Sequence, residues 1–393
     1  MALKSTHPVL GPRALNRATL DRQLLLRPAP LGVEEAVAHL VGLQAQNTKP
    51  PYYALAARLD GFRPEDLSVL MESRRVARIV SLRSTVHTHT ARDAVGLRRL
   101  VQAGAVDREL RTFRKGLDGV DLDRLATLAA AYVEERPHTP KELRERLLRE
   151  WPEADPQALA LAARCLLLMV QVTPRGLWGR SGQVALTTAR TWFDGPEDGA
   201  ADLDGTVRRY LGAFGPASVK DMQTWCGLTR LRPAFERLRP ELLVFRDERG
   251  TELFDLPDAP RPDEDTPAPP RLLPEFDNLL LSHADRGRVV PAEHHGRTWT
   301  GNQAHRTFLV DGFVAGIWHL DEAKDRTTLT VEPFAPLPRA TRAALDAEAE
   351  RTLRLMTPRG TPYDLVHAEG RRAAHDEGGG RGRPDRGGPV TGA

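Results

Sequence analysis

The chain has 393 residues, of which 40% are hydrophobic and 28% charged, with a formal net charge of +3 and a pI of about 9.0. This length exceeds one ordinary core, and the composition excludes a fibrous or disordered chain, so we expect a globular protein of several domains. No run approaches 18 uninterrupted apolar residues, and the opening "MALKSTHPVLGPR" lacks the apolar core of a signal peptide. We therefore expect a cytoplasmic protein that does not enter a membrane.

The basic residues are almost all arginine, because only six of the 56 are lysine. Arginine suits phosphate recognition through its planar fork of N–H donors. The 53 acidic residues are interspersed with them, so the composition permits nucleic-acid binding without requiring it. The two cysteines stand apart, with no C-x-x-C spacing, which disfavours a disulfide scaffold or a thiolate metal site.

The N-terminal part is predicted to form several helices and then a strand with the sequence "RIVSLRSTVHTHT". Together they form a first, looser winged-helix domain over residues 1–118. The predicted helices lie near 13–26, 33–46, 52–60 and 64–77.

The second of these helices leads into two glutamines, Gln44 and Gln46, in "GLQAQNTKPPYY". Apolar residues recur at intervals of three and four, and this period places Gln44 on the face that should be buried. Burying an unpartnered amide costs roughly 1–3 kcal/mol, so Gln44 needs a partner or a wet cleft. Pro50 and Pro51 end the helix soon after Gln46, and only a helix end lets both amides converge on one place. Two interpretations of the glutamines are therefore possible: a glutamine-rich helix cap and a polar functional site.

Two further segments share one order of elements, three helices followed by a β-hairpin, which indicates a winged helix. In residues 119–200 the second helix begins with a capping box, with Thr139 as N-cap, Pro140 at the first turn and Glu142 three residues after Thr139. In residues 201–258 the corresponding helix begins at Ser218 and is closed by Gly227.

The chain changes character after residue 258. A proline-rich linker covers residues 259–271. Residues 272–367 alternate apolar and polar positions around an Asp-Gly turn and end in a helix, which predicts a small antiparallel β-barrel or sheet with a C-terminal helix. The remainder, 368–393, is predicted to be a disordered basic tail. The fold class is therefore α+β, with three tandem winged-helix domains followed by this sheet.

Four stretches in this order resemble the winged-helix DNA glycosylases of the AlkZ/YcaQ superfamily. They are "GLQAQ" with the following prolines and "ALAARL" (42–59), "LRSTVH" (82–87), "LLPEFDNLLLSHADR" (272–286) and "FLVDGFVAGIW" (308–318). The resemblance extends from residue 13 to about residue 365. The triplet Gln44-Ala45-Gln46 resembles the Gln-Φ-Gln motif of the AlkZ-like branch, where Φ is aliphatic and Ala45 is a small version of it.

The resemblance implies hydrolysis of the N-glycosidic bond of alkylated purines in duplex DNA, including bulky adducts and interstrand crosslinks, with Gln44 and Gln46 as the catalytic residues. We expect base excision repair by a monofunctional hydrolase, because no obvious lysine nucleophile for a lyase step lies near the motif. We also expect a monomer that uses no cofactor and no metal. The hairpin that such enzymes direct toward the lesion has no clear counterpart in the irregular stretch 286–308.

Amides cannot accept a proton at neutral pH, so this pair is not a general base. An N7-alkylated purine is already cationic and leaves as a neutral base without being protonated. Two amides would then only need to hold a water against C1′ and stabilise the positive charge that develops on the sugar.

Other polar residues are candidates for binding or structure. Lys49, Arg83, His87, Arg286 and Arg288 are predicted DNA contacts, although a solvated basic loop would carry the same arginines.

Two remaining features, a histidine pair and Asp277, are interpreted as neither a metal site nor a catalytic acid. His87 and His89 would share one face of a strand, but a third metal ligand is missing. Asp277 is interpreted as a capping or turn carboxylate rather than an acid. The alternative functions are a winged-helix DNA-binding regulator with structural glutamines and a protein-interaction scaffold.

Overall fold

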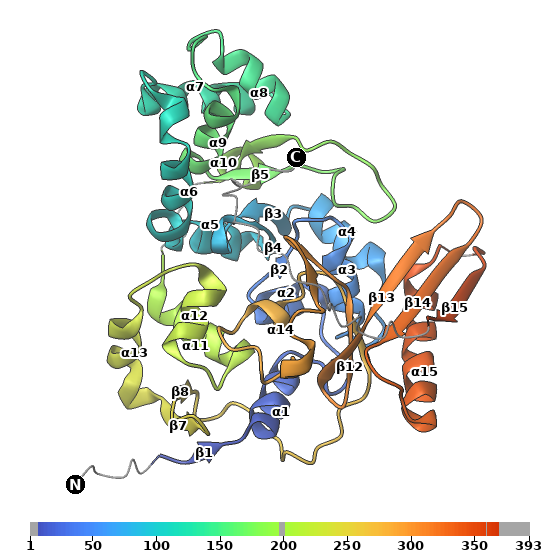
Figure 1. The fold of residues 1–393 in the computed structure, drawn as a ribbon. Coiled ribbons are helices and arrows are strands. Elements are labelled where there is room, and N and C mark those ends of the chain that lie inside the picture. The colour runs from blue at the N-terminus through green and yellow to red at the C-terminus, as the bar shows by residue number, and fades with distance from the viewer. Residues whose placement is uncertain (1–6, 196–200, 359, 369–393) are drawn as a thin grey trace, which may run out of the picture.

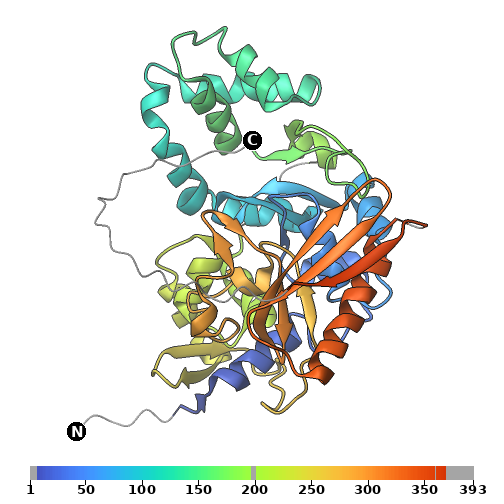
Figure 2. The same cartoon turned by 45° about the vertical axis from the view of Figure 1, so that its right-hand side comes forward.

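The computed structural model of the chain describes residues 7–195, 201–358 and 360–368. The elements before the C-terminal sheet are described as three modules in chain order, and Figure 1 shows α7, α8 and α9 of the second module standing apart from the remaining elements. Figure 2 shows the C-terminal sheet with α15 lying along it. The predicted α+β class is confirmed, and none of the described helices is both long and apolar enough to span a membrane. Apart from Ala368, the predicted basic tail lies outside the described residues.

The first module holds most of the N-terminal elements. Its helices and strands are α1 (Pro12–Arg22), α2 (Val33–His39), β2 (Leu43–Gln44), α3 (Pro50–Ala56), α4 (Pro64–Glu72), β3 (Val76–Val80), η1 (Leu82–Ser84), β4 (Val86–Thr90), α5 (Ala91–Leu100), η2 (Gln102–Val106), α6 (Asp107–Thr112) and η3 (Arg114–Leu117).

The second and third modules have the predicted order of three helices and a hairpin. The second consists of α7 (Leu122–Glu135), α8 (Pro140–Leu147), α9 (Pro156–Leu166), β5 (Met169–Gln171), β6 (Leu186–Thr188) and α10 (Ala189–Phe193). The third consists of α11 (Leu203–Phe214), α12 (Val219–Cys226), α13 (Arg232–Leu238), η4 (Arg239–Glu241), β7 (Leu243–Asp247) and β8 (Glu252–Asp255).

The predicted helix caps are present in both modules. The Thr139 hydroxyl accepts a hydrogen bond from the Glu142 N–H at 3.2 Å, and the Glu142 carboxylate accepts one from the Thr139 N–H at 2.7 Å. Ser218 and Asp221 form the equivalent capping box on α12, which ends at Gly227 with a left-handed φ of 78°. These reciprocal bonds satisfy the free N–H groups of each first turn, so the local sequence fixes where both helices start.

The helix predicted over residues 33–46 is shorter than expected. It ends at His39, and the chain turns through Val41 (φ 55°) and Gly42 (φ 92°), both in the left-handed region. Leu43 and Gln44 then form β2, which pairs antiparallel with β4. The extrapolated helical period is therefore wrong for Gln44, because Gly42 lets the backbone leave the helix.

The first two modules share one sheet. Its strand order is β2-β4-β3-β5-β6, and β3 pairs antiparallel with β5, with Arg78 opposite Gln171. Independent tandem winged-helix domains would not form backbone hydrogen bonds between their strands. The first two modules do, so they are joined more tightly than the sequence predicts. The third module has a separate sheet, in which the N-terminal strand β1 (Val9–Leu10) runs parallel to β7.

The C-terminal part is an open sheet, so of the two predicted alternatives the sheet is confirmed and the barrel is wrong. Five strands lie in the order β15-β14-β13-β12-β9, and no pairing joins the edge strands β15 and β9. The pair β14–β15 is parallel, and the other pairs are antiparallel. The elements are β9 (Arg271–Leu273), α14 (Asn278–Leu281), η5 (Ala292–His294), β10 (Trp299–Thr300), β11 (Gln303–Ala304), β12 (Thr307–Val310), β13 (Phe313–Glu322), β14 (Thr327–Pro333), α15 (Arg339–Met356) and β15 (Tyr363–His367).

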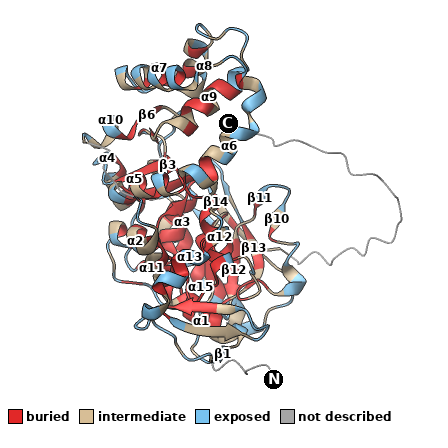
Figure 3. Ribbon diagram, turned by 90° about the vertical axis from the view of Figure 1, so that its left-hand side faces the viewer, coloured by how far each residue is buried: buried red, intermediate tan, exposed pale blue. Residues whose placement is uncertain are grey.

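The largest core joins the start of the chain to its end. Figure 3 shows the buried residues gathered in the centre of the body. Tyr52 and Tyr53 of α3 are 1% and 3% exposed, and Tyr53 packs against Trp318 of β13 with ring centroids 5.6 Å apart. The helix that follows the two glutamines is thus held against the C-terminal sheet, which makes the glutamine segment a rigid part of the fold.

Candidate active site

The motif Gln44-Ala45-Gln46 begins at the end of β2 and reaches a bend at Gln46. Gln44 is 8% exposed, Ala45 is fully buried and Gln46 is exposed. The Ala45 N–H donates to the Val86 carbonyl at 2.8 Å, which continues the pairing with β4. Side chains two apart on an extended chain point to the same side, but here the strand ends at Gln44 and the chain bends at Gln46.

Both amide oxygens accept hydrogen bonds from the protein. Gln44 Oε1 accepts from Arg83 Nη2 at 2.6 Å, and Gln46 Oε1 accepts from the Val86 N–H at 3.4 Å. A guanidinium and a backbone N–H can only donate hydrogen bonds, so the amide atom that faces each of them must be the oxygen. Within the described part of the chain, neither amide NH2 group has a protein partner. The bond to Gln44 is short and charge-assisted, whereas the bond to Gln46 is at the limit of hydrogen-bond length.

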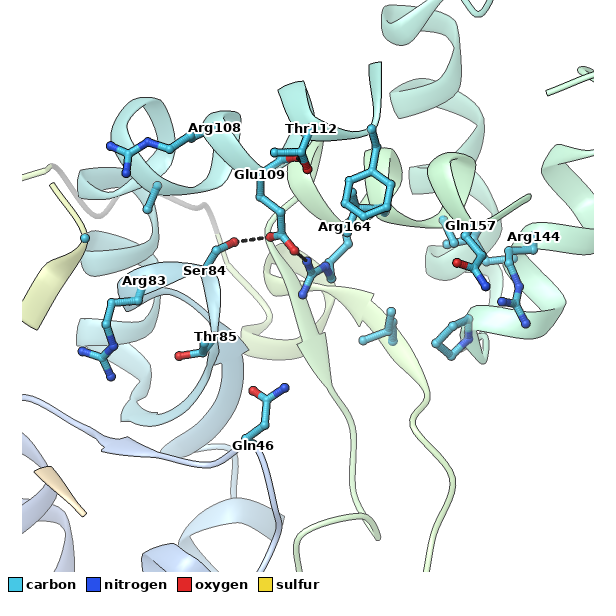
Figure 4. A pocket seen from close by; sticks show the side chains of 18 residues that line it. Gln46, Arg83, Ser84, Thr85, Arg108, Glu109, Thr112, Arg144, Gln157 and Arg164 are labelled. Carbon is cyan, nitrogen blue, oxygen red and sulfur yellow. Dashed lines mark hydrogen bonds and ion pairs between the residues drawn. The ribbon is translucent and has the colours of Figure 1, made fainter. Parts of the chain in front are cut away.

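A cleft of about 790 Å³ opens beside Gln46, between the first and second modules. Figure 4 shows Gln46, Arg83, Ser84 and Thr85 on one side of it and Gln157 and Arg144 on the other. The lining residues are Gln46, Arg83, Ser84, Thr85, Ala105, Arg108, Glu109, Thr112, Phe113, Pro140, Leu143, Arg144, Gln157, Ala160, Leu161, Arg164, Leu186 and Gly227.

The cleft carries more positive than negative charge. Glu109 accepts a hydrogen bond from the Ser84 hydroxyl and forms an ion pair with Arg164 at 2.5 Å, so its charge is compensated. Arg108 and Arg144 have no ion-pair partner among the described residues. Their guanidinium groups are therefore free to meet an anion such as a DNA phosphate.

Two arginines bind the motif directly: Arg83 through the Gln44 amide, and Arg78, whose Nη2 donates to the Ala45 carbonyl at 2.9 Å. Arg83 also contacts its surroundings. Its Nη1 donates to the Trp225 carbonyl of α12, and its Nη2 lies 3.4 Å from His87 Nε2 in addition to the bond with Gln44. Burial, together with the nearby charge of Arg286, lowers the pKa of Arg83 to about 10, so the guanidinium is still charged at neutral pH. The N–H groups of this guanidinium already donate to two protein acceptors, the Trp225 carbonyl and Gln44 Oε1.

His87 and His89 lie on one face of β4, as predicted, and their rings stack with centroids 5.5 Å apart. Burial, the charge of Arg83 and the neighbouring His89 lower the pKa of His87 well below its usual value. Burial lowers the pKa of His89 to about 4, and the ring accepts or donates a bond with Ser81 Oγ at 2.8 Å. No group of three or more His, Cys, Asp or Glu among the described residues is arranged to hold a metal.

The predicted DNA contacts separate into two groups. Arg83 and His87 lie together beside Gln44, and the Arg286 guanidinium lies 5.7 Å from the ring centroid of Trp299, close enough to affect the pKa of Arg83. Lys49 and Arg288 lie elsewhere.

Lys49 forms an ion pair with Glu322 of β13. Arg288 is 8% exposed and donates to the Pro216 carbonyl at 2.9 Å and to Thr19 Oγ1 at 3.2 Å. The side chain of Arg288 therefore joins the third module to α1, and we do not retain it as a phosphate contact.

Asp277 has the structural role that we inferred. It is the N-cap of α14 and accepts from the Leu279 N–H at 2.9 Å, and Arg58 binds both of its oxygens at 2.7 and 2.8 Å. Both side chains of this ion pair are fully buried.

The charged residues that line the cleft opposite Gln46 were not predicted from the sequence. Glu109 and Arg108 of α6, and Arg144 and Arg164 of the second module, are ordinary helical surface residues by their spacing. They come together only because β3 pairs with β5 and brings the two modules side by side.

A short hairpin, β10–β11, lies in the stretch that resisted interpretation. It pairs Trp299 with Ala304, and its tip at Gly301 and Asn302 is exposed. Trp299 packs edge-on against Phe276, with ring centroids 5.7 Å apart. Because Glu275 accepts a hydrogen bond from Asn47 at 3.3 Å, the hairpin base adjoins the segment that follows Gln46.

Comparison with known proteins gives consistent results. A family model described as DNA glycosylase AlkZ-like matches residues 37–355. The "Interstrand DNA cross-link repair glycosylase" of Streptomyces sahachiroi is 29% identical over 188 residues, 44% of this chain and 48% of that protein, so the match spans about half of the relative. The solved structure of Streptomyces sahachiroi DNA glycosylase AlkZ has a TM-score of 0.72 and 20% identity, covering 91% of this chain and 100% of that chain, which shows a shared fold. Since the family model spans most of the chain, including the glutamine motif, the chain belongs to the AlkZ-like DNA glycosylase family.

Proposed function

We propose that this protein is a monofunctional DNA glycosylase that releases N7-alkylated purines from duplex DNA, including bulky adducts and interstrand crosslinks. The observation that carries the proposal is the Gln44-Ala45-Gln46 segment, in which Gln46 lines a positively charged cleft and Gln44 is bound to Arg83 of the same lining.

The reaction needs only groups that amides provide. The C1′–N9 bond breaks, and its electron pair neutralises the cationic purine, which leaves without protonation. A water oxygen bonds to C1′ of the oxocarbenium-like sugar, and the proton that it loses passes to solvent. Gln44 and Gln46 fix the position of that water and stabilise the charge on the sugar. A neutral, unmodified base is a far poorer leaving group, so the same site discriminates against undamaged DNA.

The 18 described residues that line the cleft include no lysine. A lyase step begins with attack of an amine on C1′, so the lining supports simple hydrolysis to an abasic site. Arg108 and Arg144, which have no ion-pair partner among the described residues, are the side chains we assign to phosphate contacts across the cleft. The β10–β11 hairpin is the element we assign to the lesion, because it is exposed at its tip and adjoins the motif.

The test uses duplex DNA with a single N7-methylguanine, and in parallel a nitrogen-mustard crosslink, followed by alkali and a denaturing gel. The wild-type protein should produce strand breaks at the lesion, and Gln44→Ala and Gln46→Ala should reduce them by at least about tenfold. A matched control is Gln183→Ala, which removes an exposed amide from the β5–β6 loop and should retain the breaks. Intact strands with tight, sequence-specific binding would favour a DNA-binding regulator, and absence of DNA binding would favour an interaction scaffold.

A further inference from the structure

Arg83 and Ser84 have an unusual backbone conformation. Both have positive φ values, 54° and 58°, in the short turn η1 between β3 and β4. Residues with a side chain rarely adopt this region, and such strain persists only where the surroundings hold it in place. Ser84 is held by Glu109, and Arg83 by the bonds of its guanidinium.

The Arg83 guanidinium bridges two modules. Nη1 donates to the Trp225 carbonyl in the last turn of α12, where helix carbonyls lack intrahelical partners. Nη2 donates to Gln44 Oε1 at 2.6 Å. Gly227 lies so close to this turn that a Cβ built on it would be 3.0 Å from the Arg83 Cα. The third module therefore supports the turn that holds the motif.

His87 completes the arrangement from the other side. The distance from its Nδ1 to the Thr85 carbonyl is 3.0 Å, and a carbonyl only accepts, so Nδ1 carries the hydrogen. Nε2 is then left as a lone-pair acceptor 3.4 Å from Arg83 Nη2. Burial and the charge of Arg83 hold the pKa of His87 well below its usual value, which keeps the ring in this neutral form.

We propose that Arg83 is a positioning residue that acts through Gln44, by holding its amide oxygen against the protein and turning its NH2 group toward the cleft. This inference rests on the proposed glycosylase function. The two glutamines then have different roles. The NH2 group of Gln44 donates to the attacking water, and Gln46, whose oxygen is held only by a 3.4 Å bond, turns to accept a hydrogen from it. One lone pair of the water remains for C1′.

A direct phosphate contact is the other role that Arg83 would play in a DNA-binding cleft. The two roles differ in a measurable way. A positioning residue affects the rate of the chemical step through Gln44, whereas a phosphate contact affects DNA affinity and its dependence on salt.

The test is a double-mutant cycle. Arg83→Met and Gln44→Ala are made separately and together, and the single-turnover rate of N7-methylguanine release is measured at saturating duplex alongside the dissociation constant. We expect Arg83→Met to lower the rate by roughly 10- to 100-fold with little change in affinity, because small misplacements of catalytic groups have effects of this size. The double variant should be no slower than Gln44→Ala alone, since Arg83 has nothing left to position.

Two further variants keep the result interpretable. Arg83→Lys retains the charge but cannot bind the Trp225 carbonyl and Gln44 together, so it should also lose rate and serves if Arg83→Met fails to fold. Arg354→Gln removes an exposed arginine of α15 and should change neither rate nor affinity. Independent losses that multiply in the double variant would overturn the positioning role. A loss confined to affinity, with a weaker salt dependence, would assign Arg83 to phosphate instead. A wild-type protein that binds the duplex but releases no base would overturn the proposed function together with this inference.

Discussion

Replacing Arg58 with methionine should destabilise the fold strongly, because Arg58 forms a buried ion pair with Asp277, 219 positions away in the sequence. Arg58 binds both carboxylate oxygens of Asp277 and also donates to the Ala54 carbonyl at 3.0 Å and to Gln23 Oε1 at 3.3 Å. Both charged side chains are fully buried, and they join the end of α3 to the start of α14.

The expected loss is about 3–5 kcal/mol, the range for removing one partner of a buried ion pair. Methionine fills similar space, so the loss comes mainly from the Asp277 carboxylate, which is left buried with the backbone N–H of Leu279 as its remaining hydrogen-bond donor. Urea denaturation followed by circular dichroism measures the change. Asp277→Asn added to Arg58→Met removes the stranded charge and keeps the cap, so the double variant should be more stable than Arg58→Met by about 1–3 kcal/mol.

A loss below about 1 kcal/mol for Arg58→Met would refute this reasoning, because surface ion pairs alone reach that size. A double variant that is less stable than Arg58→Met would show that Asp277 has another buried partner that the geometry does not include. Folded Asp277→Asn protein that binds DNA and lacks excision would instead give Asp277 a chemical role.

Three further predictions concern the turn, a cap and pH. Gly227→Ala should lower stability by about 1–2 kcal/mol and slow excision, because φ is +78° and the added Cβ meets the Arg83 backbone; thermal unfolding and the glycosylase assay measure both effects. Thr139→Ala should cost about 1 kcal/mol in urea denaturation by removing the cap of α8 while DNA binding persists. The pKa of His89 is about 4 in the folded protein against 6.5 in the unfolded chain, so as the pH falls the unfolded chain binds the proton first. The free energy of unfolding is therefore highest above about pH 6.5 and decreases as the pH falls toward 4. The decrease amounts to about 2 kcal/mol between about pH 7 and pH 5, and His89→Gln should remove that part of the pH dependence.

The sequence predicts local features well where a few neighbouring residues determine them. The capping box at Thr139, the left-handed end of α12 at Gly227 and the capping role of Asp277 all follow from short-range patterns, and all three are confirmed. The Gln-x-Gln motif is also a short local pattern, and it is recognisable because it resembles a motif of the family to which the chain belongs.

Features that depend on long-range pairing could not be predicted. Gln44 belongs to a two-residue strand whose partner, His87, is 43 positions away, so the preceding helical period gave the wrong element. Gly42 was the available signal, since a glycine at that point often ends a helix. The contact between Arg83 and Trp225 joins two modules, and no local pattern in either segment indicates it. The barrel prediction was wrong for a related reason, because alternating strands indicate a sheet without showing whether its edges meet.

The central claim concerns the two amides, and direct measurement of free base tests it best. Duplex DNA with one N7-methylguanine is incubated with excess protein, and the released base is quantified by mass spectrometry without alkali. The account predicts free N7-methylguanine from the wild-type protein, at least about tenfold less from Gln44→Ala and from Gln46→Ala, and none from unmodified duplex. Folded Gln44→Ala and Gln46→Ala proteins that release the base at the wild-type rate would contradict it.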